Sequence, residues 1–270
     1  MGREENVAVF QDTERLCKTN ARLSEAVRRA TAAQKLILEQ DVLPAQNRGR
    51  FDERAVVVVS MKRTFEAASG YKGQKIAVHN FASATTPGGG VVKGSGAQEE
   101  CLCRCSSLYF SINAQAMWDG YYKPHREADD PIHNDDIIYT PGVTVFKTDT
   151  ANPKLMPESE WYDVDVITCA APKLRDRAVR MKDSELTILH EKRLRRILEV
   201  AVSEGRDTII LGAFGCGAYM NSPEAVANAS RLVIGDYLHA FKNIEFAVYC
   251  PLKDDRNYKT FARVLQEYCK

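Results

Sequence analysis

The chain has 270 residues, of which 44% are hydrophobic, and its formal net charge is +1. This composition is typical of one large globular domain with or without an appendage, and the absence of a long basic run excludes a protein that binds duplex nucleic acid directly. The first residues lack an apolar signal core and no stretch holds the roughly 18 apolar residues of a membrane span, so we expect a cytoplasmic protein with no membrane partner.

The first 50 residues consist mainly of helix formers. Asp12 and Thr13 provide a start signal, and apolar residues recur at helical spacing as far as Leu36, before Pro44 interrupts the pattern. This segment carries too few large apolar residues for a core of its own. We therefore expect a helical N-terminal cap over residues 1–50 that packs against a second domain over residues 51–270.

A compact strand-helix-strand unit is predicted next. Residues 55–60 form a valine-rich run that fits a strand buried on both faces, as in a parallel or mixed sheet. Residues 64–70 form a short helix that ends on glycine, and residues 75–79 supply the next strand. Ligands of open α/β sheets bind where strands end and helices begin, so the chain after His79 is a candidate site.

Residues 80–100 have the most unusual composition of the chain. Three successive glycines at 88–90 remove every side chain from one turn, so backbone N–H groups can approach a ligand closely, as a phosphate-binding loop requires. A helix is predicted to start within residues 94–100, with Ser95 as its cap and a Gln-Glu-Glu triplet in its first turns. An anion-binding turn and two adjacent acids therefore lie within one short span.

Glu99 and Glu100 have two interpretations. Acids at a helix start are stabilised by the helix dipole, so the pair could be a solvated helix end. Alternatively, glycosidic cleavage needs a carboxylic acid that protonates the leaving oxygen, and the neighbouring turn would hold a phosphate-bearing ligand beside it. Because the helix dipole lowers the pKa of a carboxyl group, a general acid here requires desolvation or a nearby ligand phosphate.

The remaining chain alternates helices and strands, which indicates an α/β fold. A polar, proline-containing connection without regular structure is expected over residues 119–134. Pro141-Gly142 is expected to split one strand into two pieces. The predicted helices are 97–109, 181–204, 223–241 and 258–268, and the predicted strands are 137–146, 161–169, 208–211 and 244–250.

A second glycine-rich turn, residues 212–224, follows the strand at 208–211. Ser222 and Pro223 suit the cap and first position of the next helix. Neither turn matches the dinucleotide-binding Gly-x-Gly-x-x-Gly pattern or a P-loop, and one glycine turn alone is equally well explained as an ordinary tight turn. Two such turns at strand ends, together with the Gln-Glu-Glu triplet, favour a cleft that holds a diphosphate from both sides.

The eight cysteines are expected to be reduced thiols, because no secretory signal accompanies them. Cys101, Cys103 and Cys105 cluster in the sequence, yet only the first and last of them would share a helix face. No Cys-His pair with zinc-finger spacing lies nearby, so we expect buried thiols and no metal site.

Several motifs together resemble those of proteins that process ADP-ribose. Asn80-Phe-Ala-Ser followed by Gly-Gly-Gly resembles a loop of macrodomains, and Gly-Gly-Gly separated by seven residues from Gln-Glu-Glu is similar to the signature of poly(ADP-ribose) glycohydrolases. Residues 164–172 and 212–219 add matches typical of the microbial branch of that family. The resemblance, which runs from about residue 55 to the end, implies a macrodomain-like three-layer α/β/α fold with a mixed central sheet behind a helical cap.

Transferred residue by residue, the resemblance implies that Glu100 is the catalytic acid and that Glu99 holds ribose hydroxyls. Tyr219 stands where the family usually has phenylalanine and should pack over the ribose and diphosphate. Ser83 stands where macrodomains generally carry a ribose-binding asparagine. A serine at this position is similar to the microbial branch. The substrate-binding residues implied are Asn80, Ser83, Gly88, Gly89, Gly90, Val91, Gln98, Ala213, Phe214, Gly215, Cys216, Gly217, Ala218 and Tyr219.

The implied activity is hydrolysis of the ribose-ribose O-glycosidic bond of poly(ADP-ribose), which releases ADP-ribose without a metal or other cofactor. If the N-terminal helices close over the distal ribose, only polymer ends can enter and the enzyme is exo-acting. Two alternatives remain open at this point. One is a hydrolase of mono-ADP-ribose conjugates on protein or nucleic acid, and the other is a module that binds ADP-ribose without cleaving it.

Overall fold

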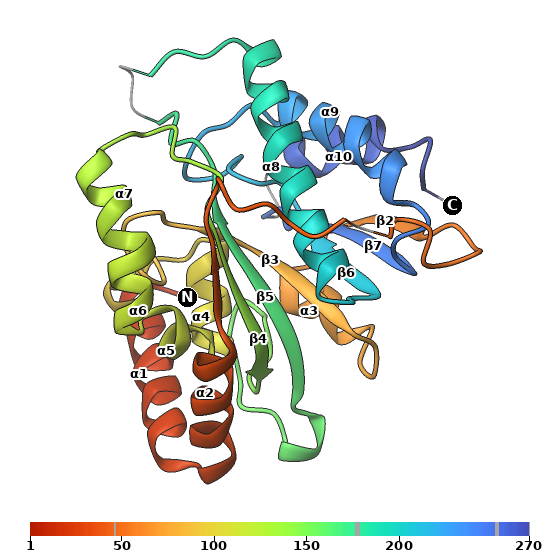
Figure 1. The fold of residues 1–270 in the computed structure, drawn as a ribbon. Helices are drawn as coiled ribbons and strands as arrows, with labels where there is room; N and C mark the ends of the chain where they lie inside the picture. The colour runs from red at the N-terminus through yellow and green to blue at the C-terminus, as the bar shows by residue number, and fades with distance from the viewer. Residues whose placement is uncertain (46, 176–178, 252–253, 270) are drawn as a thin grey trace.

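The structure is a computed structural model that describes residues 1–45, 47–175, 179–251 and 254–269. A seven-stranded mixed sheet lies between two layers of helices (Figure 1). Neighbouring strands run parallel from β5 to β2, whereas β4 is antiparallel to both of its neighbours. In spatial order the strands are β1 (Lys35–Ile37), β4 (Ile137–Val145), β5 (Tyr162–Ala170), β3 (Ile76–Ala82), β6 (Thr208–Leu211), β7 (Asn243–Ala247) and β2 (Val56–Ser60).

Each face of the sheet has its own hydrophobic core. Side chains alternate between the two faces along a strand, so Ala77 and Val78 of β3 belong to opposite cores. One core is completed by α8 (Asp183–Ser203), α9 (Pro223–Ile234) and α10 (Arg256–Val264). The other is completed mainly by α3 (Thr64–Ser69), α4 (Gln98–Cys105), α5 (Leu108–Ile112) and a π-helical turn at Trp118–Tyr122.

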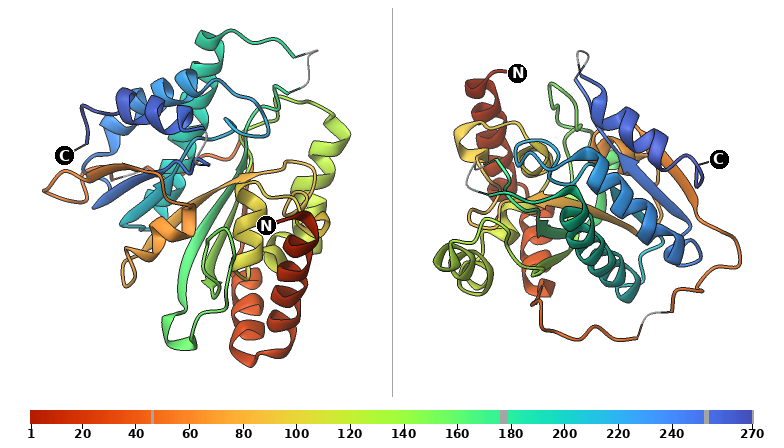
Figure 2. Two further views of the ribbon diagram at one scale, coloured as in Figure 1. Left: turned by 180° about the vertical axis from the view of Figure 1, so that it is seen from behind. Right: turned by 90° about the horizontal axis from the view of Figure 1, so that it is seen from above.

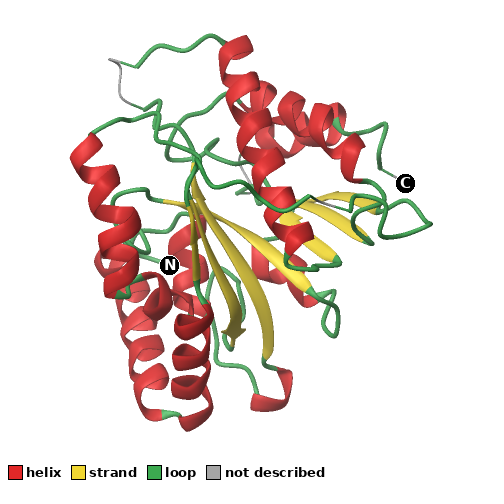
Figure 3. Cartoon of the chain, viewed as in Figure 1, coloured by secondary structure: helices red, strands yellow, loops and turns green. Residues whose placement is uncertain are grey.

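The remaining helices of the described chain lie beside this second core. α1 (Arg3–Thr19) and α2 (Ala21–Ala33) form an antiparallel pair, as the two views in Figure 2 show. Short α6 (Gln115–Met117) and α7 (Lys123–Ala128) precede β4. Loops join most of these elements (Figure 3), whereas α6, the π-helical turn and α7 follow one another without a break. Among the described residues, none of the helices combines the length and apolar character that crossing a bilayer requires.

The predicted fold class, an α/β fold with a mixed sheet behind a helical start, is confirmed. The strands predicted at 75–79, 161–169 and 208–211 are β3, β5 and β6. The prediction for residues 55–60 is wrong in one respect, because β2 is an edge strand and Val56 is 41% exposed. A run of valines does not distinguish an edge strand from a central one, since only the pairing partners do.

The N-terminal segment contributes to the sheet as well as to the helices. After α1 and α2, Lys35–Ile37 pairs antiparallel with β4, which the helical spacing around Leu36 did not indicate. A strand of three residues is too short to leave a period-two pattern in the sequence. The domain boundary near residue 50 remains a prediction.

Four local predictions are corrected. The helix expected over 97–109 is two helices, because Ser106 leaves the helix to bridge Val145. Residues 119–134 include the π-helical turn and α7. Pro141-Gly142 makes a bulge within one continuous strand. Ser95 does not cap α4, which begins at Gln98 after Ala97.

Candidate active site

A cavity of about 700 Å³ opens at the carboxyl ends of β3, β5, β6 and β7. Two segments face each other across it, and we call them the acid wall (residues 88–100) and the tyrosine wall (residues 212–221). The carboxyl ends of parallel strands meet at one edge of a sheet, which is why turns more than a hundred residues apart come together here. The two glycine-rich turns therefore belong to one site, as predicted from the sequence.

Gln98, the first residue of α4, joins the helix to the end of β3. Its side-chain amide donates hydrogen bonds to the Thr64 hydroxyl at 3.0 Å and to the His79 carbonyl at 2.8 Å. Its carbonyl oxygen accepts one from the Phe81 amide at 2.9 Å. The nitrogen and the oxygen of the side-chain amide thus both have hydrogen-bond partners. Gln98 therefore fixes the start of the helix that carries the two acids.

Glu99 is buried, and it lines the cavity beside Glu100. Its carboxyl group accepts hydrogen bonds from the Ser83 amide at 2.8 Å and from the Asn80 side chain at 3.3 Å. Burial raises the pKa of Glu99 to about 8, and the neighbouring Glu100 adds to this, although the Ser83 amide opposes it. At neutral pH the side chain therefore retains a proton and can both donate and accept a hydrogen bond.

Glu100 presents one oxygen that has no partner among the described residues. The Gly90 amide donates to Oε1 at 2.8 Å, while Oε2 is buried without a hydrogen bond. Gly89 has φ +57°, and a Cβ at this position would lie 2.6 Å from Oε1. The glycine turn thus leaves the space that the carboxyl group occupies, which a residue with a side chain could not do.

Helix α1 supports the acid wall from outside the cavity. The Asn6 side chain donates to the Gly94 carbonyl at 2.9 Å, and a Cβ on Gly94 would overlap the carbonyl oxygen of Arg3. Thr13 donates to the Arg104 carbonyl at the other end of α4 at 2.5 Å. Among the described residues that line the cavity, the first along the chain is Arg63, so α1 and α2 contribute no lining side chain.

The tyrosine wall is held by a buried amide. Asn221 donates to the carbonyls of Pro172 at 2.7 Å and Gly215 at 3.2 Å, and it accepts from His190 at 2.8 Å. Gly215 has φ +75°, and a Cβ there would lie 2.6 Å from the Cβ of Ala171. The turn therefore approaches the end of β5 more closely than any larger residue would allow.

Most of the predicted site residues come together in the cavity, and four do not line it. Asn80 lies behind Glu99 and also donates to Thr168 at 3.2 Å. Val91 is buried in the core under the acid wall, and Cys216 packs against the core on the opposite face. Gly88 completes the glycine turn without lining the cavity. The predicted residues that line it are Ser83, Gly89, Gly90, Gln98, Glu99, Glu100, Ala213, Phe214, Gly215, Gly217, Ala218 and Tyr219.

One end of the cavity is formed by residues that the sequence reasoning missed. The Arg63 guanidinium lies 3.9 Å from the centroid of the Tyr249 ring, and Cys101 accepts a hydrogen bond from Arg63 at 3.4 Å. Asp149 accepts from the Phe65 amide at 3.0 Å, and burial raises its pKa to about 6. Cys101 follows the Gln-Glu-Glu triplet within α4, whereas Arg63, Asp149 and Tyr249 lie outside the helices and strands without a recognisable motif, so only their meeting in space identifies them.

The opposite end is formed by Asp130, His133 and Lys173, which the sequence reasoning also missed. They lie in loops that were expected to be irregular, and such loops give no periodic signal. Within the described ranges, no group of histidine, cysteine and acidic side chains is arranged to hold a metal ion.

Comparison with known proteins identifies relatives over most of the chain. Residues 4–148 match the family model described as "Microbial-type PARG, catalytic domain". A solved poly(ADP-ribose) glycohydrolase from Thermomonospora curvata is 28% identical, with coverage of 97% of this chain and 99% of that chain and a TM-score of 0.86. A structure of that enzyme with one glutamate mutated to alanine has a TM-score of 0.83, at 28% identity over 97% and 99% of the two chains.

A second relative is solved with a ligand. The poly(ADP-ribose) glycohydrolase from Deinococcus radiodurans in complex with ADP-ribose is 30% identical, with coverage of 90% of this chain and 98% of that chain and a TM-score of 0.79. None of the curated protein sequences compared with the chain matches it.

Proposed function

The chain belongs to the microbial-type poly(ADP-ribose) glycohydrolase family, and we propose that its cavity holds one ADP-ribose unit with Glu100 as the acid that frees it. The protein is a glycohydrolase that hydrolyses the ribose-ribose O-glycosidic bond of poly(ADP-ribose). The observation that carries the residue assignment is the arrangement of the two carboxyl groups against the glycine turn.

Glu100 has the geometry of a proton donor. Because Oε1 accepts the Gly90 amide, we assign the transferred proton to Oε2, the oxygen without a hydrogen bond among the described residues. Protonation of the leaving ribose oxygen breaks the bond through an oxocarbenium-like state, and the resulting carboxylate can then accept a proton from the attacking water. The solved glutamate-to-alanine mutant of the T. curvata enzyme is consistent with a functional glutamate.

Glu99 is proposed to anchor the ribose next to that bond. Its raised pKa leaves a carboxyl group that can donate to one hydroxyl and accept from another. Asn80 and the Ser83 amide hold this group in place from below. Glu99 therefore needs no charge for its role, which avoids two carboxylates side by side in a buried site.

The two glycine turns are proposed to hold the diphosphate between them. Neither turn places a bulky side chain at its tip, so the ligand can approach the backbone of both. The end of the cavity that Arg63 and Tyr249 form is proposed to bind the adenine base of ADP-ribose. An aromatic ring and a guanidinium plane both stack on nucleobases.

Exo action is proposed from the position of α1. This helix packs against the outer side of the acid wall through Asn6 and Arg3, and we propose that it limits the path of a polymer on that side. Free ADP-ribose should then be the first product of long polymer. Early release of short oligomers would contradict exo action without affecting the assignment of Glu100.

Glu100→Gln tests the central assignment. The amide keeps the size of the side chain but cannot deliver the proton, so release of ADP-ribose from polymer should fall by at least about 100-fold, the usual scale for a general acid. Binding of ADP-ribose, measured by calorimetry, should persist. Wild-type turnover by a folded Glu100→Gln variant would remove Glu100 from the mechanism. Parallel assays on mono-ADP-ribosylated protein and nucleic acid determine whether the leaving group is restricted to ribose.

A further inference from the structure

His133 combines three properties that the roles proposed above do not use. It lies in the loop between α7 and β4 and lines the cavity. Its φ is +60°, a backbone conformation that is uncommon for residues other than glycine, although histidine, asparagine and aspartate adopt it more often than the rest. Its Nδ1 atom is buried without a partner among the described residues. Such backbone strain persists only where the surroundings enforce it, and it occurs often at ligand sites.

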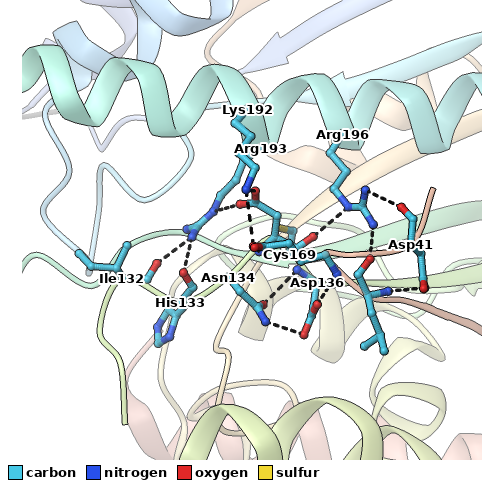
Figure 4. Close-up of polar contacts among 12 residues, drawn as sticks. Asp41, Ile132, His133, Asn134, Asp136, Cys169, Lys192, Arg193 and Arg196 are labelled. Atoms are coloured by element: carbon cyan, nitrogen blue, oxygen red, sulfur yellow. Dashed lines mark hydrogen bonds and ion pairs between the residues drawn. The ribbon is translucent and has the colours of Figure 1, made fainter. Parts of the chain in front are cut away.

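Arg193 of α8 enforces this conformation. The side chain is only 1% exposed, and its guanidinium donates to the carbonyls of Ile132 and His133, each at 2.8 Å (Figure 4). The same group donates to Asp135 at 2.8 Å and to the Ala170 carbonyl at the end of β5 at 2.8 Å. One buried cation thus joins the loop to the sheet on both sides of His133, while the His133 ring points away from α8.

The ring of His133 faces the tyrosine wall. Its centroid lies 6.5 Å from that of Tyr219 and 6.0 Å from that of His125. His125 is fully engaged, since its two nitrogens contact the Tyr121 carbonyl and the Asn134 side chain, each at 2.8 Å. His133 is therefore the imidazole at this end of the cavity that has hydrogen-bonding capacity left.

The charge state of His133 suits a neutral donor. The pKa of His133 is lowered to about 4, mainly by burial and also by Arg193, His125 and Lys173, while Asp130 opposes them. At neutral pH the ring then carries one N–H donor and one acceptor nitrogen.

We propose that His133 is a further ligand-binding residue, whose ring donates a hydrogen bond to a diphosphate oxygen of the ADP-ribose unit beside Tyr219. The inference rests on the proposed function, because it takes ADP-ribose as the ligand of this cavity. Arg193 acts as a positioning residue, since it presents the ring without lining the cavity itself.

His133→Gly separates binding from folding. Glycine adopts positive φ without cost, so the thermal midpoint should stay the same or rise, whereas a histidine with a purely structural role would lower it when removed. The Kd for ADP-ribose should rise about tenfold, equal to roughly 1.4 kcal/mol, as expected for one hydrogen bond to a charged group. The Kd for ADP should rise by the same factor, because ADP retains the diphosphate.

Val42→Gly is the control. Val42 also lies in a loop, but it is 94% exposed and does not line the cavity. Its substitution should leave both Kd values at the wild-type level.

The outcomes are distinguishable from a failure of the proposed function. Failure of the wild-type protein to bind ADP-ribose would overturn the function itself. Wild-type affinity in a folded His133→Gly variant would overturn the role of His133, and weaker binding of ADP-ribose with unchanged binding of ADP would overturn the contact with the diphosphate. If the glycine variant does not fold, His133→Ala, which has no side-chain donor, carries the same binding test.

Discussion

The acid wall and the tyrosine wall use glycine for different physical reasons. Gly89 leaves room for a carboxyl group of its own wall, because a Cβ would lie 2.6 Å from Glu100 Oε1. Gly215 leaves room for a neighbouring strand end, because its Cβ would lie 2.6 Å from that of Ala171. One wall is therefore shaped around its reactive group and the other around its packing, although both are rich in glycine. Substitutions in the first should change the chemistry, and substitutions in the second should change stability.

The largest effect is expected for Gly89→Ala. The added methyl group must displace Glu100, and a displacement of about 1 Å costs on the order of 100-fold in rate. ADP-ribose release from polymer should fall by about that factor. Gly205→Ala is the control, because Gly205 also has positive φ, +68°, but no atom lies within 4 Å of its added Cβ. It should lose about 1 kcal/mol of stability and retain full activity. Equal activity of Gly89→Ala and Gly205→Ala would show that a methyl group at position 89 does not displace Glu100.

Gly215→Ala should act mainly on folding. Its positive φ and its overlap with Ala171 should lower the free energy of unfolding by about 2–3 kcal/mol, measured by urea denaturation. Ala171→Gly in the same chain should restore part of that loss, because it removes the atom that the new methyl group meets. No recovery in the double variant would show that the contact with Ala171 is not the cause.

Asn6→Ala tests whether α1 maintains the acid wall. The variant leaves the Gly94 carbonyl without its buried donor, so stability should fall by roughly 1 kcal/mol and turnover by about fivefold. Gln11→Ala, an exposed position on the same helix, is the matched control and should match wild type in both measurements. A loss of stability with unchanged turnover would limit α1 to a structural role.

The smallest expected effect is a pH dependence to which Glu99 of the acid wall contributes near neutral pH. Since burial raises the pKa of Glu99 to about 8, the folded state binds this proton more tightly than the unfolded state does. The resulting stabilisation is complete below pH about 4.5 and is lost as pH rises through 8. Asp149, with a pKa of about 6, contributes with the same sign at lower pH.

The measurement is the thermal midpoint between pH 6.5 and 8.5. Wild type should decline by a few degrees over this window, and Glu99→Gln should decline less, because its amide does not titrate. Residues 212–219 of the tyrosine wall contain no acidic side chain, so substitutions there should leave the slope unchanged. Parallel slopes for wild type and Glu99→Gln would contradict the raised pKa.

Local sequence signals predicted those parts of the site that each lie within a single strand-turn-helix unit, one after β3 and one after β6. Glu99, Glu100 and both glycine turns belong to this group, because their residue types and spacing are visible within about 20 positions. Asp149, Arg63 and His133 were not predictable in this way. Each is a single residue in a loop, and its place in the cavity depends on which strands become neighbours. The edge position of β2 was missed for the same reason.

The attachment of α1 also has a consequence for the order in which the site can be completed during synthesis. Through Asn6 and Thr13 the helix contacts Gly94, Arg104 and Lys147. These contacts span sequence separations of 88, 91 and 134 positions. Strand β2 waits longer still, since its partner β7 begins at Asn243. Such non-local pairing is slow and leaves apolar surface exposed until late in folding. A nascent chain therefore has a complete acid wall only after its C-terminal half has begun to emerge from the ribosome, and its sheet closes last.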